Sequence, residues 1–381
     1  MYWTVYMESG PKRVNHAAVA IGDLIYSFGG YCTGRNYKVK TPMDVHILNT
    51  VTLKWKSLPL PKPGDPQYKV GPYKRYGHTA VYWNGKAYIW GGRNDEYVDN
   101  ILYCFDPETY EWTQIETGCY IPSARDGHSA CVIKSQMFVF GGFDEAIDHY
   151  SDELCVLNFN TMQWQRVKTK GKPPSYRDFH TATAVNDRMY VFGGRGDQRI
   201  GGSESYSQNI HYLDTTDFCW YKPDTSGDIP IGRRSHSAFF YGDHIFIFGG
   251  FNSLTCEHFN DLYKFCVKTH YWQKVTTRGL TPSRRRRQAC IVIGDCVYMF
   301  GGTSPVERRR SLVDEEFYEL VDQSPRYVLE FVPSLKTLGI ISAIEYHGAK
   351  SLLTFPLPNE IKLEIELLSR YSRTIEKYKT N

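Results

Sequence analysis

Paired cysteines are missing from this sequence. Its 10 Cys are scattered singly along 381 residues, and no Cys-x-x-Cys occurs. A structural zinc site or a disulfide framework requires paired spacings, so the pattern excludes both. Most of these cysteines lie inside apolar, strand-like stretches, which indicates buried and reduced thiols. We therefore expect no metal and no cofactor.

Long apolar runs, a secretory signal and Asn-x-Ser/Thr sequons are missing too. No apolar run approaches the length of a membrane span, and residues 1–5 contain no signal-peptide core. The net formal charge is only +4, so bulk charge does not require a nucleic-acid partner, although arginines cluster at 233–234, 284–287 and 308–310. We expect a protein of the cytoplasm and nucleus without a membrane anchor.

Aromatic residues and glycine are abundant. Aromatics make up 15% of the chain, with 29 Tyr and 8 Trp, and Gly reaches 32. This composition suits many short strands that are separated by tight turns. Apolar residues make up 41%, which is enough for a core and excludes global disorder.

The strongest pattern is an internal repeat that occurs six times. Each copy has an Arg, three residues later a His or Gln, and thirteen residues after that a Gly-Gly doublet. The doublets begin at Gly29, Gly91, Gly141, Gly193, Gly249 and Gly301. The His or Gln residues are His16, His78, His128, His180, His236 and Gln288, and the arginines are Arg13, Arg75, Arg125, Arg177, Arg233 and Arg285. Five copies have a downstream Trp: Trp55, Trp112, Trp164, Trp220 and Trp272.

Each repeat predicts four short strands. In the examples, a first strand covers 16–20, a turn at Gly22-Asp23 follows, and a second strand covers 25–28 and leads into the doublet. A third strand is of the type 154–157, and a fourth begins at the Trp. Four-stranded units at this spacing are typical of the blades of a β-propeller. We expect one propeller domain over residues 1–332.

The two ends of the ring are predicted to meet in the sixth blade. That repeat has no Trp after its third strand at 327–331, whereas an additional Trp3 lies near the N-terminus. We expect residues near Trp3 to form the fourth strand of the sixth blade. Such closure removes the exposed sheet edges that promote aggregation.

This repeat resembles that of the kelch family over residues 1–332. The resemblance implies an all-β, six-bladed kelch β-propeller that works as a binding module and not as an enzyme. A residue that recurs in every blade is more plausibly structural than a ligand contact, so the repeated Arg and His residues are interpreted first as structural. The remaining His residues are spread over different blades without metal spacing.

The candidate binding site is the mouth of the central channel, where blades differ from one another. At the position before the His or Gln, the blades have Asn15, Gly77, Gly127, Phe179, Ser235 and Arg287. The fifth and sixth blades add further cations beside this position, and two more arginines follow doublets. The candidates for binding a carboxylate are Arg233, Arg234, Ser235, Arg286, Arg287, Arg195 and Arg93. Arginine suits a carboxylate because it donates two parallel hydrogen bonds. For single residues, solvation or pairing with Asp126 or Asp178 stays an open alternative.

After residue 332 the periodicity becomes helical. Residues 333–343 predict a short helix with Ser334 as N-cap, and Leu335, Leu338 and Ile341 share one face. A second helix is predicted to open at Leu357-Pro358 and to continue through an apolar stripe: Ile361, Leu363, Ile365, Leu367, Leu368 and Ile375. This segment, 333–381, either packs on the outside of the ring or presents an apolar face to a partner. The pattern alone leaves both possibilities open.

The C-terminal segment resembles two motifs of ubiquitin-ligase receptors. Leu335, Gly339 and Ala343 are similar in spacing to an elongin-binding box, although Gly339 stands where that motif has Cys. Leu357, Pro358, Ile361 and Ile365 are similar to a cullin-2 box. A Gly inside a helix costs about 1 kcal/mol and leaves a partner pocket unfilled, so the elongin half departs further from its pattern.

The whole chain resembles the group of kelch propellers that serve as substrate receptors of cullin-2 RING ubiquitin ligases. That resemblance implies elongin-B, elongin-C, cullin-2 and its RING subunit as partners, with catalysis carried by other subunits. It also implies that the mouth captures substrates whose free C-terminus is glycine. The alternative is a non-degradative scaffold on chromatin or the cytoskeleton, which the basic runs favour weakly. A copper-oxidase function, known in some kelch propellers, would need converging metal ligands that the spacing does not provide.

Overall fold

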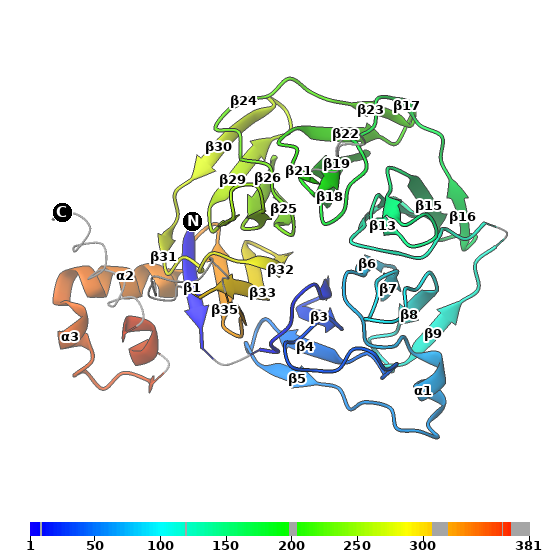
Figure 1. Cartoon of the computed structure of the whole chain (residues 1–381). Helices are drawn as coiled ribbons and strands as arrows, with labels where there is room; N and C mark the ends of the chain where they lie inside the picture. The colour runs from blue at the N-terminus through cyan, green and yellow to red at the C-terminus, as the bar shows by residue number, and fades with distance from the viewer. Residues whose placement is uncertain (8–9, 119, 198–203, 307–318, 360, 367–381) are drawn as a thin grey trace, which may run out of the picture.

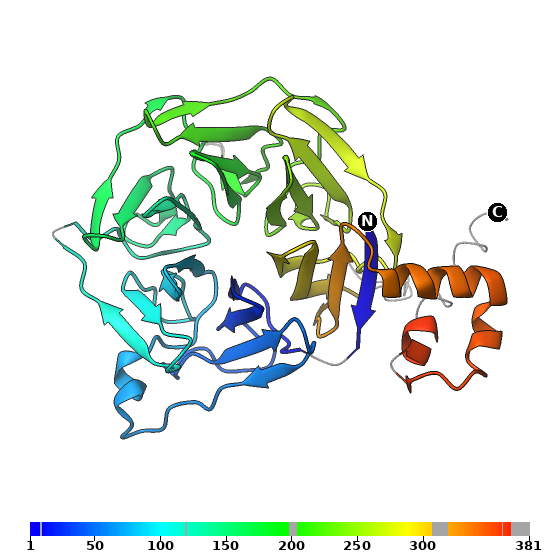
Figure 2. The same ribbon diagram turned by 180° about the vertical axis from the view of Figure 1, so that it is seen from behind.

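Six multi-stranded sheets are arranged around a central channel (Figures 1 and 2). The structure, a computed structural model, describes residues 1–7, 10–118, 120–197, 204–306, 319–359 and 361–366. The first strands of neighbouring blades contact one another, so these strands form the inner wall of the ring. The six-bladed kelch-type propeller predicted from the repeat is confirmed.

The first three blades are each built from four antiparallel strands. The first contains β2 (Ala17–Ile21), β3 (Leu24–Phe28), β4 (Val45–Asn49) and β5 (Trp55–Ser57). The second contains β6 (Thr79–Trp83), β7 (Lys86–Trp90), β8 (Leu102–Phe105) and β9 (Trp112–Ile115). The third contains β11 (Ser129–Ile133), β12 (Gln136–Phe140), β15 (Leu154–Asn158) and β16 (Gln163–Arg166). These bounds lie within a residue or two of the predicted strands.

The fourth and fifth blades each carry one extra, parallel edge strand. The fourth contains β18 (Thr181–Val185), β19 (Arg188–Phe192), β22 (Ile210–Asp214) and β23 (Cys219–Tyr221), with β17 (Lys170–Gly171) at its edge. The fifth contains β25 (Ser237–Tyr241), β26 (His244–Phe248), β29 (Leu262–Cys266) and β30 (Tyr271–Val275), with β24 (Ser226–Gly227) at its edge.

Small hairpins project from the connections between second and third strands in three blades. They are β13 (Phe143–Asp144) with β14 (His149–Tyr150), β20 (Gly196–Asp197) with β21 (Glu204–Ser205), and β27 (Phe251–Asn252) with β28 (Glu257–His258). β10 (Arg125–Asp126) pairs with β13. A short helix, α1 (Pro66–Val70), lies in the connection between the first two blades.

The tight turns follow from their residues. In the second blade Asn84 and Gly85 join β6 to β7, and both have positive φ angles, 46° and 80°. An Asn-Gly pair adopts this left-handed turn readily, and its twist matches that of the two strands. In the first blade the predicted Gly22-Asp23 turn joins β2 to β3.

The N-terminal strand closes the ring. β1 (Tyr2–Tyr6) pairs antiparallel with β35 (Arg326–Glu330), so that Trp3 lies opposite Leu329. The sixth sheet is completed by β32 (Arg286–Ile293), β33 (Cys296–Pro305), β34 (Leu320–Asp322) and, at the edge, β31 (Arg278–Gly279). The predicted role of the Trp3 segment as the missing fourth strand is confirmed.

The blade tryptophans fill the spaces between blades. Each Trp packs against the aromatic residue that precedes the doublet in the neighbouring blade, with ring centroids 5.1–5.7 Å apart. The pairs are Trp55–Phe300, Trp112–Phe28, Trp164–Trp90, Trp220–Phe140, Trp272–Phe192 and Trp3–Phe248. Trp3 therefore makes the contact that the sixth repeat lacks.

The C-terminal segment lies outside the ring, next to β1 (Figure 1). α2 (Leu335–His347) begins after Ser334, whose hydroxyl accepts a hydrogen bond from the Thr337 N–H at 3.1 Å, as an N-cap does. This helix begins two residues later than the predicted 333–343 and ends about one turn later. α3 (Ala349–Leu352) follows, and residues 361–366 are helical.

The second predicted helix begins slightly later than expected. The carbonyl of Pro358 accepts a helical hydrogen bond from Lys362 at 3.0 Å, whereas Leu357 and Pro358 themselves are not helical. The predicted apolar residues from 367 onward lie outside the described residues. Across the described part of the chain, no helix combines the length and hydropathy that a membrane crossing requires.

Candidate functional site

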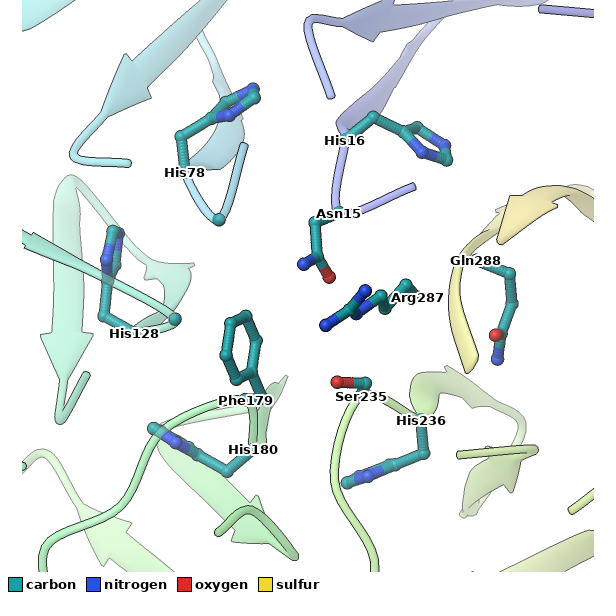
Figure 3. A pocket seen from close by; sticks show the side chains of 12 residues that line it. Asn15, His16, His78, His128, Phe179, His180, Ser235, His236, Arg287 and Gln288 are labelled. Carbon is teal, nitrogen blue, oxygen red and sulfur yellow. The ribbon is translucent and has the colours of Figure 1, made fainter. Parts of the chain in front are cut away.

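Six residues, one from each blade, line a central cavity of about 130 Å³ (Figure 3). They are the residues that precede the repeated His or Gln: Asn15, Gly77, Gly127, Phe179, Ser235 and Arg287. In Figure 3 the side chains of Asn15, Phe179, Ser235 and Arg287 point toward the middle of the channel. These residues therefore lie at the mouth of the channel, as the sequence predicted.

These six residues are joined by a closed ring of backbone hydrogen bonds. Each N–H donates to the carbonyl of the equivalent residue in the preceding blade, over distances of 2.7–3.2 Å, and Asn15 donates back to Arg287. All six have positive φ angles of 49–70°. Glycine adopts this conformation without strain, but Phe179 and Arg287 do so only because the ring holds them there. The backbone thus fixes the side chains that face the cavity.

The repeated His residues are structural, as their recurrence predicts. His128 Nε2 is bonded to the Thr79 hydroxyl at 2.8 Å, and His180 Nε2 to the Ser129 hydroxyl at 2.7 Å. Gln288 takes the same role in the sixth blade by donating to the Phe248 carbonyl at 3.1 Å. Burial lowers the pKa of His128 to about 3, so the ring stays neutral. Within the described ranges, no three His, Cys, Asp or Glu side chains converge as metal ligands do.

Three arginines gather beside the cavity on the fifth and sixth blades. The guanidinium of Arg286 lies 4.4 Å from the ring centre of Phe251, and that of Arg234 lies 5.6 Å from the same ring. Burial, together with the charges of Arg287 and Arg234, lowers the pKa of Arg286 to about 9. Burial and the charge of Arg234 lower the pKa of Arg287 as well. The three cations therefore repel one another in a partly dry environment.

No carboxylate among the described residues forms an ion pair with these three arginines. The Nε atoms of Arg286 and Arg287 are buried and have no hydrogen-bond partner in the part of the chain that the structure describes. An unpaired, buried donor on a cation is costly unless a ligand supplies an acceptor. We call Arg234, Arg286 and Arg287 the arginine cluster.

The other predicted arginines lie elsewhere. Arg233 is fully buried and binds Asp261 and the Gly249 carbonyl, so its guanidinium does not reach the mouth. Arg195 forms two hydrogen bonds with Asp178, one from Nε at 3.2 Å. Arg195 is therefore paired with an acidic neighbour, which is the alternative that the sequence left open.

Arg93 lies on the second blade, away from the arginine cluster. Its guanidinium lies 3.6 Å from the Glu145 carboxylate and is 30% exposed, so it forms a loose surface pair. The structure thus brings together Arg234, Ser235, Arg286 and Arg287. Arg195 lies near them, but its guanidinium is paired with Asp178 and, at 3.4 Å, with Glu204. Arg93 and Arg233 are paired with other carboxylates.

Two other blades carry acidic residues at an equivalent position. Asp126 and Asp178 occupy, in the third and fourth blades, the repeat position that Arg234 and Arg286 occupy in the fifth and sixth. Burial raises the pKa of Asp126 to about 7. This repeat position is therefore acidic in two blades and cationic in two others.

A second group next to the arginine cluster was not predicted. The carboxylate of Glu204 accepts hydrogen bonds from the hydroxyls of Tyr206, at 2.8 Å, and Ser253. Glu204 and Ser253 come from connections of different blades, 49 residues apart in the chain. No motif joins them, so only the fold shows that they meet.

The C-terminal segment divides its apolar residues between a small core and an exposed face. Ile340, Leu352 and Ile365 are buried together, with Ala343, Leu357 and Ile361 packed around them. Leu335 and Leu338 of the same helix are 88% and 48% exposed. A Cβ on Gly339 would meet no atom within 4 Å. The elongin-like motif therefore has two exposed positions, Leu335 and Gly339, whereas most of the cullin-like motif packs within the segment.

The repeat, the ring and its tryptophan seams define a kelch-repeat β-propeller. The chain belongs to the kelch-repeat family: residues 77–302 match the KLHDC2/KLHL20/DRC7 Kelch-repeats domain, and residues 12–62 match the Kelch motif. Proteins of this family are typically not enzymes.

Individual relatives agree with this assignment. The chain is similar to Kelch domain-containing protein 3 of Bos taurus and of Homo sapiens, with 44% identity over 376 residues that cover 97% of this chain and 96% of each relative. It is 28% identical to Kelch domain-containing protein 2 of Bos taurus over 332 residues, which cover 79% of this chain and 78% of that one. A solved structure titled "Structure of YjhT" shares the fold with a TM-score of 0.59 at 16% identity, covering 78% of this chain and 93% of that one.

Proposed function

We propose that this protein is the substrate-recognition subunit of a cullin-2 RING ubiquitin ligase. Its propeller mouth binds the free C-terminus of substrates that end in glycine, and its C-terminal segment recruits elongin-B, elongin-C and cullin-2. The observation that carries the proposal is the arginine cluster, which has unpaired donors beside a narrow central cavity. Ubiquitin transfer itself is carried by other subunits.

A carboxylate meets the needs of the arginine cluster. It accepts two parallel hydrogen bonds from one guanidinium, and such charge-assisted bonds are about twice as strong as neutral ones. Its negative charge also relieves the repulsion among these arginines, which adds to burial in lowering the pKa of Arg286. Ser235, next to Arg234 and in the wall of the cavity, supplies a hydroxyl donor.

The size of the cavity supports selection of glycine. Its volume of about 130 Å³ is small, and the Phe179 ring and the Arg287 side chain point into it (Figure 3). The backbone ring holds both residues, so their backbone cannot move outward without breaking inter-blade hydrogen bonds. A terminal residue with a Cβ would therefore meet a rigid wall.

The exposed face of α2 supports the recruitment half of the proposal. Leu335 and Leu338 expose apolar surface on a helix whose opposite side is already packed. Exposed apolar side chains of this kind on a rigid helix suit docking into a groove of a partner.

Deletion of residues 333–381 separates this function from that of a non-degradative scaffold. A receptor that lacks this segment still binds its substrate but no longer degrades it, whereas a scaffold keeps both its partner and its cellular effect. Purification of the intact chain at native levels is the accompanying test. The proposal predicts that elongin-B, elongin-C and cullin-2 are recovered, and their absence would contradict it.

A further inference from the structure

The first blade breaks a hydrogen-bond pattern that the other five blades share. In those five blades the Nε of the repeated Arg donates to the carbonyl two residues earlier, over 2.8–3.2 Å. Its Nη1 donates to the carbonyl of the first glycine of the doublet, over 2.8–3.4 Å. These two bonds hold the chain segment just before the Arg, and the first glycine of the doublet, against the guanidinium.

Arg13, the equivalent residue of the first blade, makes neither bond. Its Nη1 donates to the Ser27 carbonyl at 3.3 Å, and its Nη2 donates to Asp44 at 2.9 Å. Its Nε is buried and has no hydrogen-bond partner among the described residues, although the side chain is only 3% exposed. Pro11, which lies two residues earlier, and Arg13 instead line one cavity.

A cavity of about 290 Å³ opens where the pattern breaks. It is more than twice as large as the cavity at the mouth and lies close to the lower end of the size range of small-molecule sites, about 300 Å³. Its charged lining residues are Lys12, Arg13, Arg35, Asp44 and Lys74, and the rest of the wall consists of Pro11, Gly29, Gly30, Cys32, Tyr37 and His46.

The charges that line this cavity favour a ligand with more than one negative charge. Four cationic side chains face one carboxylate, a formal excess of three positive charges before His46 is counted. Lys74 is close to Asp44, at 3.3 Å, and Arg13 shares the same carboxylate oxygen. Lys12 and Arg35 are exposed and form no ion pair within the described part of the chain.

Asp44 in the same lining favours a ligand that carries a hydrogen-bond donor. All three neighbours of Asp44 contact its Oδ2, whereas Oδ1 is buried and has no partner in the described ranges. A buried carboxylate oxygen without a donor is costly, and a ligand hydroxyl would remove that cost. A phosphate monoester of a polyol supplies both the dianion and a nearby hydroxyl.

We propose that the cavity of the first blade binds a small, hydroxyl-bearing phosphate monoester of pentose-phosphate size. Lys12, Arg35 and the free Nε of Arg13 hold the phosphate, and a ligand hydroxyl donates to Asp44 Oδ1. This site is distinct from the arginine cluster on the fifth and sixth blades. The proposal that it binds a phosphate monoester does not depend on the proposed ligase function.

Calorimetric titration of the full chain tests the proposal with three probes: ribose 5-phosphate, inorganic phosphate and ribose. The proposal predicts that ribose 5-phosphate binds more tightly than inorganic phosphate, and that ribose does not bind. Affinity should fall as salt is raised, because the charges are partly exposed. No measurable binding of ribose 5-phosphate at millimolar concentration would overturn the proposal, as would equal binding of ribose.

Substitution locates the site. Both Lys12 and Arg35 are exposed, so the double variant Lys12→Ala/Arg35→Ala keeps the fold, which the unfolding midpoint verifies. We expect it to bind ribose 5-phosphate at least about tenfold more weakly. Lys54→Ala, an exposed cation on the outer part of the same blade, is the matched control and should bind like the unmodified protein. Unchanged affinity in the double variant, or an equal loss in the control, would contradict the assignment.

Discussion

Trp3 lies opposite Leu329 in the sixth blade, so the first and last strands of the ring are neighbours in one sheet. The indole of Trp3 also packs against Phe248 of the fifth blade, with ring centroids 5.7 Å apart. One residue thus joins the chain ends and seals the seam between two blades. Ring closure depends on the N-terminal strand because no other described strand can take its place between β31 and β35.

Trp3→Ala should therefore destabilise the whole ring. Trp3 is 1% exposed, and truncation of a buried Trp costs about 3–5 kcal/mol in the free energy of unfolding. Denaturant unfolding followed by tryptophan fluorescence measures this loss. Met7→Ala, at a residue that is 55% exposed just after the same strand, is the control and should change stability by less than about 0.5 kcal/mol. Similar stability of the two variants would show that closure does not depend on Trp3.

Repeat spacing predicted the ring because fixed offsets reflect one structural unit used six times. The Trp that the sixth repeat lacks and the additional Trp3 together predicted the closing strand. Contacts between residues far apart in the chain were not predictable in the same way. The partner of Arg195 is Asp178, and that of Glu204 is Ser253. Asp178 was among the candidate partners in the sequence, and the fold assigns it to Arg195, whereas no motif joins Glu204 to Ser253.

Arg233 shows where reasoning from clustered charge fails. It and Arg234 are adjacent in sequence, but adjacent residues in extended chain point to opposite sides. Arg233 therefore turns into its blade, where it is fully buried, whereas Arg234 is only half-buried and its guanidinium lies over the Phe251 ring. Arg233 also belongs to the repeated set, and recurrence in every blade already indicated a structural role.

Substitutions at Arg233 and in the arginine cluster should have different effects. Arg233→Ala leaves the partly buried Asp261 unpaired and should lower the free energy of unfolding by about 3 kcal/mol or more. Arg287→Asn and Arg286→Gln should leave stability nearly unchanged but weaken binding of a Gly-ending peptide at least about tenfold. Asn suits position 287 because Asn15 adopts the same left-handed conformation in the first blade.

Fluorescence anisotropy with a labelled peptide, together with thermal unfolding of each variant, separates the two effects. Arg284→Ala is the matched control, since Arg284 is a neighbouring arginine that is 60% exposed and only loosely paired with Glu257. If Arg286→Gln and Arg287→Asn both bound the peptide with unchanged affinity, the arginine cluster would not be the carboxylate site.

Acid should destabilise the protein through its buried histidines. Burial lowers the pKa of His78, His128 and His236 to about 3, from 6.5 in the unfolded chain. Below pH 6.5 the unfolded state binds more protons than the folded state, so stability is complete above pH 6.5 and falls as the pH drops toward 3. His128→Gln, which copies the residue of the sixth blade, should reduce the loss between pH 6 and pH 5 by about 1 kcal/mol. If urea unfolding showed the same dependence of stability on pH for the variant and the unmodified protein, this prediction would be wrong.

Gly339→Cys should strengthen binding to elongin-C. The added side chain meets no atom of this protein within 4 Å, and replacing Gly by Cys within a helix stabilises the helix by about 0.3 kcal/mol. The new side chain also fills the position that the elongin-binding motif reserves for Cys. Calorimetry with purified elongin-B/C measures the change.

Two further variants control this measurement. Leu335→Ala should weaken elongin binding, because Leu335 is the most exposed apolar residue of the motif at 88%. Leu60→Ala, an exposed apolar residue on the ring, should have no effect. If Leu335→Ala bound elongin-B/C normally, the face of α2 would not be the docking surface.

The central claim is that the mouth binds a free C-terminal carboxylate, and one comparison tests it most directly. Binding of the intact chain is measured with two peptides of identical sequence, one ending in a free glycine carboxylate and the other in glycine amide. The account predicts measurable affinity for the free acid and a loss of at least about tenfold for the amide, because the amide removes the charge that the arginine cluster requires. Equal affinity for the two peptides would contradict it.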